Sequence, residues 1–157
     1  YLGGSSAAAA ETSGVAALLF AAAPSATAAQ VRRAIIVGAN TDVPALHGKV
    51  EANGLLSATG ALAALAHPDT TAPAAFGATG PAFTFKSRAA GPVTFAWTPA
   101  SDPELEGYSL DVDGHTTILP PGTTTFRTTL RPGKHRWRVA AYDLSGNRTA
   151  ATGPARG

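Results

Sequence analysis

The sequence predicts two structural classes in one chain, a helical N-terminal part of α/β type followed by an all-β antiparallel sandwich. Hydrophobic residues recur at helical spacing up to about residue 66 and alternate with polar residues from residue 76 onward. A Pro- and Ala-containing stretch, residues 67–75, separates the two patterns and indicates a linker, because its prolines hold the chain extended. The predicted domains are therefore residues 1–66 and 76–157.

Composition narrows the class of protein. The chain has 157 residues, which fits one or two domains, and a formal net charge of +2. It has no cysteine, which excludes disulfides and thiol chemistry and is compatible with a secreted bacterial protein. Residues 67–157 contain nine Lys or Arg and seven Asp or Glu, so the excess positive charge belongs to the C-terminal part.

The first segment of the chain is rich in glycine, serine and alanine. A Gly-Gly-Ser-Ser sequence leads into an Ala-rich stretch, and Ser6 lies where that helix would begin. The N–H groups of a helix N-terminus can stabilise a developing oxyanion, and Gly4 permits a tight entry into the helix. The segment is thus compatible with a reactive serine at a helix N-terminus. A plain alanine-rich helix is the alternative reading.

The apolar run of residues 7–23 is predicted to be a buried helix, neither a signal peptide nor a membrane span. A signal peptide requires positively charged residues at its start, and here no Lys or Arg precedes Arg32. Residues 11–14 (Glu-Thr-Ser-Gly) interrupt the run, whereas a membrane span needs about 20 apolar residues.

Two further helices are expected before the linker. Thr27 and Gln30 have the spacing of a capping box, and Ser57 can cap the third helix. Val31 and Ala34 mark an apolar face of the second helix, and Arg32 and Arg33 are expected on the opposite side.

These segments resemble, in the right order, the nucleophile region and following helices of subtilisin-like serine proteases. The family pattern G-T-S-M-A-x-P-H-V-x-G-x-x-A-L matches at Gly4, Ser6, Ala8, Gly14, Ala17 and Leu18, and the next phrase matches at Pro24, Thr27, Gln30, Val31 and Arg32. The resemblance implies that Ser6 is the catalytic nucleophile, with Gly4 and Ser5 in the nucleophile loop. It also implies the C-terminal part of a secreted serine endopeptidase that acts on proteins or peptides. The catalytic Asp and His would then lie upstream of residue 1, so this fragment alone is expected to be inactive without the missing N-terminal portion.

Two departures keep alternatives open. Ala10 and Glu11 replace the Pro-His pair of the family pattern, which would also suit an inactive pseudo-protease. No cofactor or metal is expected in the fragment, because its four histidines follow no metal-ligand spacing. Calcium is expected, if at all, elsewhere in the parent protein.

The C-terminal part shows the period of two that is typical of strands. Phe83 and Phe85 alternate with polar residues, and Asp113-Gly114 suits a two-residue hairpin turn. Three longer runs alternate in the same way: Val93, Phe95 and Trp97; Tyr108, Leu110 and Val112; and Trp137, Val139 and Ala141. Short strands with one apolar face each predict an antiparallel sandwich.

The same residues resemble a fibronectin type III-like domain, through Trp97 in Phe-Ala-Trp-Thr-Pro and the phrase from Leu130 to Asn147. The resemblance implies an accessory module, either a spacer or a binder of a cell surface or polysaccharide. Arg136 and Arg138 are expected on one face of a strand, near Lys134 and Arg131, as a patch for an anionic surface. Solvated charges on an edge strand are the alternative. No aromatic residues interleave with these cations, so nucleic acid is not expected as a partner.

Overall fold

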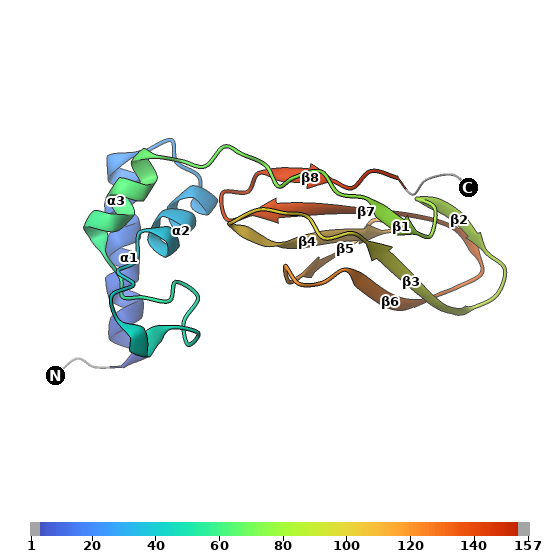
Figure 1. Ribbon diagram of the computed structural model, residues 1–157, viewed down its shortest axis with the longest axis horizontal. Coiled ribbons are helices and arrows are strands. Elements are labelled where there is room, and N and C mark those ends of the chain that lie inside the picture. The colour runs from blue at the N-terminus through green and yellow to red at the C-terminus, as the bar shows by residue number, and fades with distance from the viewer. Residues whose placement is uncertain (1–3, 154–157) are drawn as a thin grey trace. The chain divides into compact units, whose positions relative to one another are not determined.

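The computed structural model describes residues 4–153, and the chain divides into two compact units, residues 1–70 and 71–157 (Figure 1). We call them the helical unit and the β unit. The described helices are α1 (Ser5–Ala22), α2 (Ala28–Val37), the 3-10 helix η1 (Pro44–Leu46) and α3 (Ala58–Ala66). The described strands are β1 (Ala78–Gly80), β2 (Thr84–Ser87), β3 (Gly91–Trp97), β4 (Leu105–Val112), β5 (His115–Leu119), β6 (Thr125–Leu130), β7 (Gly133–Asp143) and β8 (Arg148–Ala150).

The predicted caps of α2 and α3 are confirmed. The Gln30 N–H donates to the Thr27 hydroxyl over 3.2 Å, and the Thr27 N–H donates to the Gln30 side chain over 2.8 Å, which completes the capping box. The Gly60 N–H donates to the Ser57 hydroxyl over 3.1 Å. Each bond satisfies an N–H group that a helix start would otherwise leave without a partner.

The core of the helical unit is small. Its buried hydrophobic residues are Leu19, Val31, Ala34 and Ala61. Several larger side chains stay outside it, among them Leu18, which is 57% exposed, and Phe20, which is 41% exposed. Because Leu19 alone in α1 is buried, the prediction of a buried first helix is wrong for this chain. By length and composition α1 could cross a membrane, a property shared by core helices of soluble proteins and by signal sequences.

Arg33 also differs from its predicted position. It is buried, and its guanidinium donates to the carbonyl oxygens of Ala64 over 3.5 Å and of His67 over 3.2 Å. These carbonyls belong to the C-terminal end of α3, where a cation complements the helix dipole. Helical spacing alone cannot show this role, because the partner carbonyls lie more than 30 residues away in sequence.

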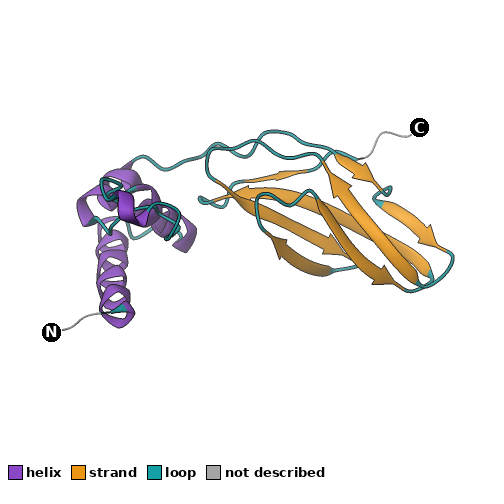
Figure 2. Cartoon of the chain, turned by 60° about the horizontal axis from the view of Figure 1, so that its bottom comes forward, coloured by secondary structure: helices purple, strands orange, loops and turns teal. Residues whose placement is uncertain are grey.

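The β unit consists of two antiparallel sheets (Figure 2). The smaller sheet has the order β1-β3-β6, and the larger has the order β2-β7-β4-β5, with β8 also paired to β7. The predicted hairpin is confirmed, since Val112 pairs with His115 across Asp113 and Gly114. Asp113 and Gly114 both have positive φ, 53° and 85°, as this tight turn requires.

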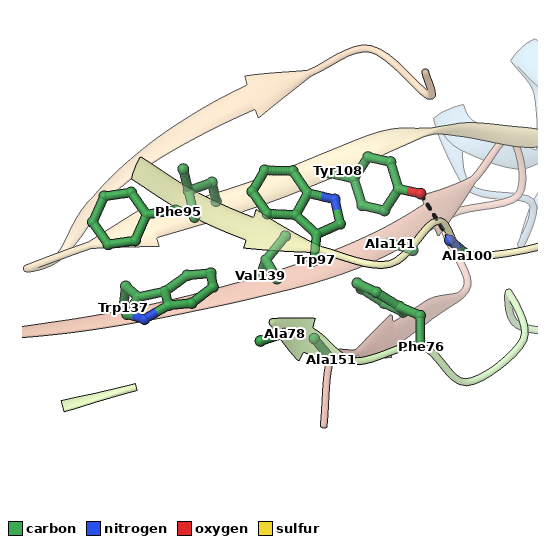
Figure 3. Packing of buried hydrophobic residues seen from close by; sticks show 11 residues of the cluster. Phe76, Ala78, Phe95, Trp97, Ala100, Tyr108, Trp137, Val139, Ala141 and Ala151 are labelled. Carbon is green, nitrogen blue, oxygen red and sulfur yellow. Dashed lines mark hydrogen bonds between the residues drawn. The ribbon is translucent and has the colours of Figure 1, made fainter. Parts of the chain in front are cut away.

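One hydrophobic cluster fills the space between the two sheets (Figure 3). Phe95 and Trp97 enter it from β3, Tyr108 from β4, and Trp137 from β7. The Tyr108 hydroxyl accepts a hydrogen bond from the Ala100 N–H over 2.9 Å, so its one polar atom is satisfied inside the core. The predicted inward residues of the alternating runs are thus the ones that the sandwich buries.

The antiparallel, β-rich class predicted for the C-terminal part is confirmed, and the helices predicted before it are present. In the helical unit the described residues form no strand, but Asn40 and Leu55 form an isolated antiparallel β-bridge. The predicted boundaries at 66 and 76 stay predictions.

Candidate functional site

Ser6, the predicted nucleophile, lies in the first turn of α1 and is exposed. Gly4 is the N-cap with a φ of 92°, and its carbonyl accepts from the N–H groups of Ala7 and Ala8, so the predicted tight entry through glycine is present. Ser5 is the first residue of the helix and is also exposed. Nothing in the structure tests a catalytic role for these three residues.

The described residues of the helical unit place no base beside Ser6. Its two histidines bind backbone carbonyls: His47 Nε2 lies 2.9 Å from the Thr41 oxygen, and His67 Nδ1 lies 3.0 Å from the Ala63 oxygen. Across residues 4–153, no group of three His, Cys, Asp or Glu side chains is placed to hold a metal ion.

A shallow apolar groove of about 350 Å³ lies between α1 and α2. Arg32 and Glu51 line this groove and form an ion pair, with 2.6 Å between the nitrogen and the oxygen. Both side chains are exposed to water, which limits what this pair contributes to stability. The groove is lined by Thr12, Ala16, Phe20, Ala28, Val31, Arg32, Ile35, Ile36 and Glu51.

The charged residues predicted on β7 do lie on one face. Lys134, Arg136 and Arg138 alternate with inward residues and are all exposed. Lys86 on β2 lies directly opposite Lys134 and adds a fourth cation to the same outer face. We call these four residues, Lys86, Lys134, Arg136 and Arg138, the cationic stripe.

The members of the cationic stripe have no ion-pair partner among the described residues. Lys86 and Lys134 are like charges facing each other across two strands, an arrangement that destabilises a sheet. Asp111 lies across from Arg138 on β4, and its carboxylate also accepts from the Gly114 N–H and the Thr116 hydroxyl. Positive charge is therefore concentrated on this face, and Asp111 offsets part of it at the Arg138 end.

The alternative reading, charges that guard an edge strand, does not fit Arg136 and Arg138. β2 has one neighbour and is an edge, but β7 lies between β2 and β4. Arg136 and Arg138 are thus on an interior part of β7, where no edge needs protection, whereas Lys134 lies beyond the end of the pairing with β4.

Charge also changes sign along the sheet. β4 and β7 are antiparallel, so the Gly133 end of β7 lies by the Asp113-Gly114 turn and its Asp143 end lies by Leu105. Asp102, Glu104 and Glu106 are near that second end, away from the cationic stripe. The stripe is a local concentration of charge on a chain whose net charge is small.

The turn next to the stripe is fixed by an ion pair. His135 Nδ1 lies 2.6 Å from the Asp113 carboxylate, whose other oxygen accepts from the Arg136 N–H over 2.8 Å. His135 Nε2 lies 2.9 Å from the Arg131 carbonyl oxygen, so both ring nitrogens face acceptors. The hydrogen bond to Asp113, followed by that to the Arg131 carbonyl, raises the pKa of His135 above its ordinary value. The bond to His135 and then that to the Arg136 N–H lower the pKa of Asp113.

Sequence analysis missed Lys86 and His135 as members of this region. The alternation Thr84-Phe85-Lys86 already predicts that Lys86 and Phe85 point to opposite faces of the strand. The pairing of β2 with β7, however, joins residues about 50 positions apart and leaves no local signal in the sequence. His135 falls on the inward side of β7 by the same alternation, although its partner Asp113 cannot be identified from spacing.

Comparison with known proteins gives little. No family model matches the chain, and no curated protein matches it. One solved structure does, the spore cortex lytic enzyme SleM of Clostridium perfringens, at 23% sequence identity and a TM-score of 0.39. The match covers 54% of this chain and 28% of that enzyme. A likeness at this level assigns neither a fold nor an activity to this chain.

The subtilisin-like assignment made from the sequence is wrong, together with the serine endopeptidase activity and the protease class inferred from it. No family model and no curated protein matches the chain, and the solved structure that does match is described as a spore cortex lytic enzyme. The physical reason lies in the motif: its matching residues at the first helix are Gly, Ser, Ala and Leu, common residue types that match a short pattern by chance in an Ala-rich segment. The pseudo-protease alternative depended on the same assignment and loses its basis with it.

Proposed function

We propose that the β unit is a fibronectin type III-like accessory module of an extracellular protein and that it binds an anionic polysaccharide through the cationic stripe. The observation that carries the proposal is the cluster of exposed cations with no ion-pair partner among the described residues, three of them on an interior strand. Two antiparallel sheets around one aromatic core support the type of module. This fold hosts many functions, so the binding argument rests on the stripe alone.

The face suits a charged, hydroxyl-rich polymer better than a nucleic acid. Thr84 lies beside Arg136 on the outer face, and Thr116 follows Asp111 and Arg138 across the same sheet. These hydroxyls can donate to and accept from sugar hydroxyls. Single-stranded nucleic acid is held by stacking on aromatic rings, and the stripe and its paired neighbours carry none.

The test measures binding of the full chain to dextran sulfate, with uncharged dextran as the matched polymer. We expect binding to dextran sulfate alone, weakened as salt is raised, because exposed charges are screened at distances near 10 Å at about 0.1 M salt. Lys134→Glu/Arg138→Glu should weaken it about tenfold or more, since exposed ion pairs contribute up to about 1 kcal/mol each and reversal adds repulsion.

The control is Lys49→Glu/Arg127→Glu, which changes the net charge equally but lies off the stripe, in the helical unit and on the outer face of β6. It should retain most of the affinity. Equal losses in the two double variants would mean that net charge alone drives binding. Tighter binding of a single-stranded oligonucleotide, lost in the same stripe variant, would contradict the polysaccharide assignment.

A further inference from the structure

Strands with a single neighbour leave N–H and C=O groups free for another strand, and proteins usually guard such edges. The described part of the β unit has five of them: β1, β2, β5, β6 and β8. Three carry a basic residue, Lys86 in β2, Arg127 in β6 and Arg148 in β8. β1 has three residues and an irregular register, which also hinders pairing.

β5 lacks these protections. Its sequence, His115-Thr116-Thr117-Ile118-Leu119, contains no Lys, Arg, Asp, Glu or Pro, and its register with β4 is regular. Within the described residues it makes no backbone hydrogen bond outside that pairing. Ile118 points to the outer face and is 61% exposed, the largest exposed fraction among the big hydrophobic residues of the described chain.

Space for another strand's side chains exists on the inner side of this edge. A groove of about 310 Å³ runs between β5 and β6 and is partly apolar. Thr117 lines it from β5, and Phe126 and Leu130 line it from β6. An added strand would therefore meet apolar surface on both sides, Ile118 outside and the groove inside.

We propose that β5 pairs with β5 of a second copy of this chain, antiparallel and centred on Thr117. In that register Thr117 faces its own equivalent, and Thr116 faces Ile118 of the other copy. Because no charged residue lies between Thr116 and Leu119, the symmetric pairing brings no like charges together. β-branched cross-strand pairs such as Thr with Ile favour sheets. The interface is the same patch on both copies, as a two-fold dimer requires.

The dimer is weak and reversible. A five-residue strand contributes far less surface than the roughly 1,200–2,000 Å² of a stable interface. Self-association should thus appear only as the protein concentration is raised, and the monomer should dominate when it is dilute.

The register can be tested with single cysteines, because the chain has none of its own. In a two-residue hairpin the pair beside the turn, here Val112 and His115, is hydrogen bonded, so the N–H and C=O of His115 point toward β4. Because these groups alternate in direction along a strand, the N–H and C=O of Thr117 also point toward β4. Facing Thr117 residues of two copies then form a non-hydrogen-bonded pair, in which side chains come closest. Mild oxidation should cross-link Thr117→Cys at least several-fold faster than Thr116→Cys, whose counterpart lies opposite Ile118 instead.

Sedimentation of the full chain over a wide concentration range supplies the second arm. Ile118→Lys places a guarding charge on the edge and should abolish association, whereas Thr94→Lys adds the same charge to β3, an interior strand of the other sheet, and should leave it intact. Circular dichroism confirms that both variants fold. A monomer at every concentration, a dimer that Ile118→Lys leaves unchanged, or faster cross-linking of Thr116→Cys would each overturn the proposal.

Discussion

Asp113 shows how one residue can connect a turn to the strand beside it. Its φ of 53° meets the demand of the hairpin, and its carboxylate binds both His135 and the Arg136 N–H. Asp at the first position of a two-residue turn is expected from the sequence. Its second role is not, because His135 lies 22 residues away and only the pairing of β4 with β7 brings the two together.

This contact predicts a pH dependence of stability. The pKa of His135 is higher in the folded state than its ordinary value of 6.5. Its contribution to stability is therefore complete at pH values below 6.5 and is lost as the pH rises through the folded-state pKa. The lowered pKa of Asp113 means that its contribution is present above 3.8 and is lost as pH falls through its folded value. The Asp113–His135 pair therefore stabilises the fold most at pH values between 3.8 and 6.5, the ordinary pKa values of the two groups.

Asp113→Asn keeps a residue that tolerates positive φ but removes the charge. Urea unfolding should show that the variant is less stable than the wild type near about pH 5.5 and that the difference shrinks near about pH 8.5, where unpaired His is neutral. An equal difference at both pH values would show that the charge of His135 plays no part.

At the scale of elements, the strands that sequence analysis found are those with large apolar residues on one face. β3, β4 and β7 alternate Phe, Trp, Tyr, Leu and Val with polar residues, and all three were predicted. β6 was missed and β5 was implied only by the predicted hairpin turn, because threonine occupies both faces of each strand and weakens the alternation. Their place in the sandwich depends on pairing with β4 and β3, which no local pattern encodes.

The crossing of α2 and α3 makes a second element-scale prediction. A Cβ on Gly60 would lie 2.0 Å from the Gly38 carbonyl oxygen, which is backbone and cannot move aside cheaply. Gly60→Ala should therefore lower the free energy of unfolding of the helical unit by about 1–3 kcal/mol.

Gly14→Ala is the matched control, because Gly14 is also helical and a Cβ there meets nothing within 4 Å. It should raise helix stability by about 0.5–1 kcal/mol. Helix content followed by circular dichroism during thermal unfolding measures both variants. Gly60→Ala as stable as the wild type would show that the two helices do not approach this closely.

At the scale of the molecule, the two units differ in how much of their apolar surface they bury. Among the described residues, the β unit has eleven buried hydrophobic residues in one cluster, whereas the helical unit has four. The sequence predicted the division into a helical and a β part because hydrophobic period is a local property. It could not supply the family, since small residues such as Gly, Ser and Ala match many motifs by chance and say little about chemistry.

The cationic stripe likewise could be predicted only in part. Alternation along β7 placed Lys134, Arg136 and Arg138 on one face, and the structure confirms it. That β7 is an interior strand, and that Lys86 joins it from β2, follows from long-range pairing. This pairing is what distinguishes a binding face from a guarded edge.

The most direct test of the account is an NMR titration of the isotope-labelled full chain with dextran sulfate at low salt. The account predicts that the amide shifts of β2 and of residues 134–138 move together and saturate, while those of the outer face of β3 and β6 stay in place. Salt should reverse these changes. Shifts spread evenly over all exposed basic residues, or confined to the helical unit, would contradict a binding site on the cationic stripe.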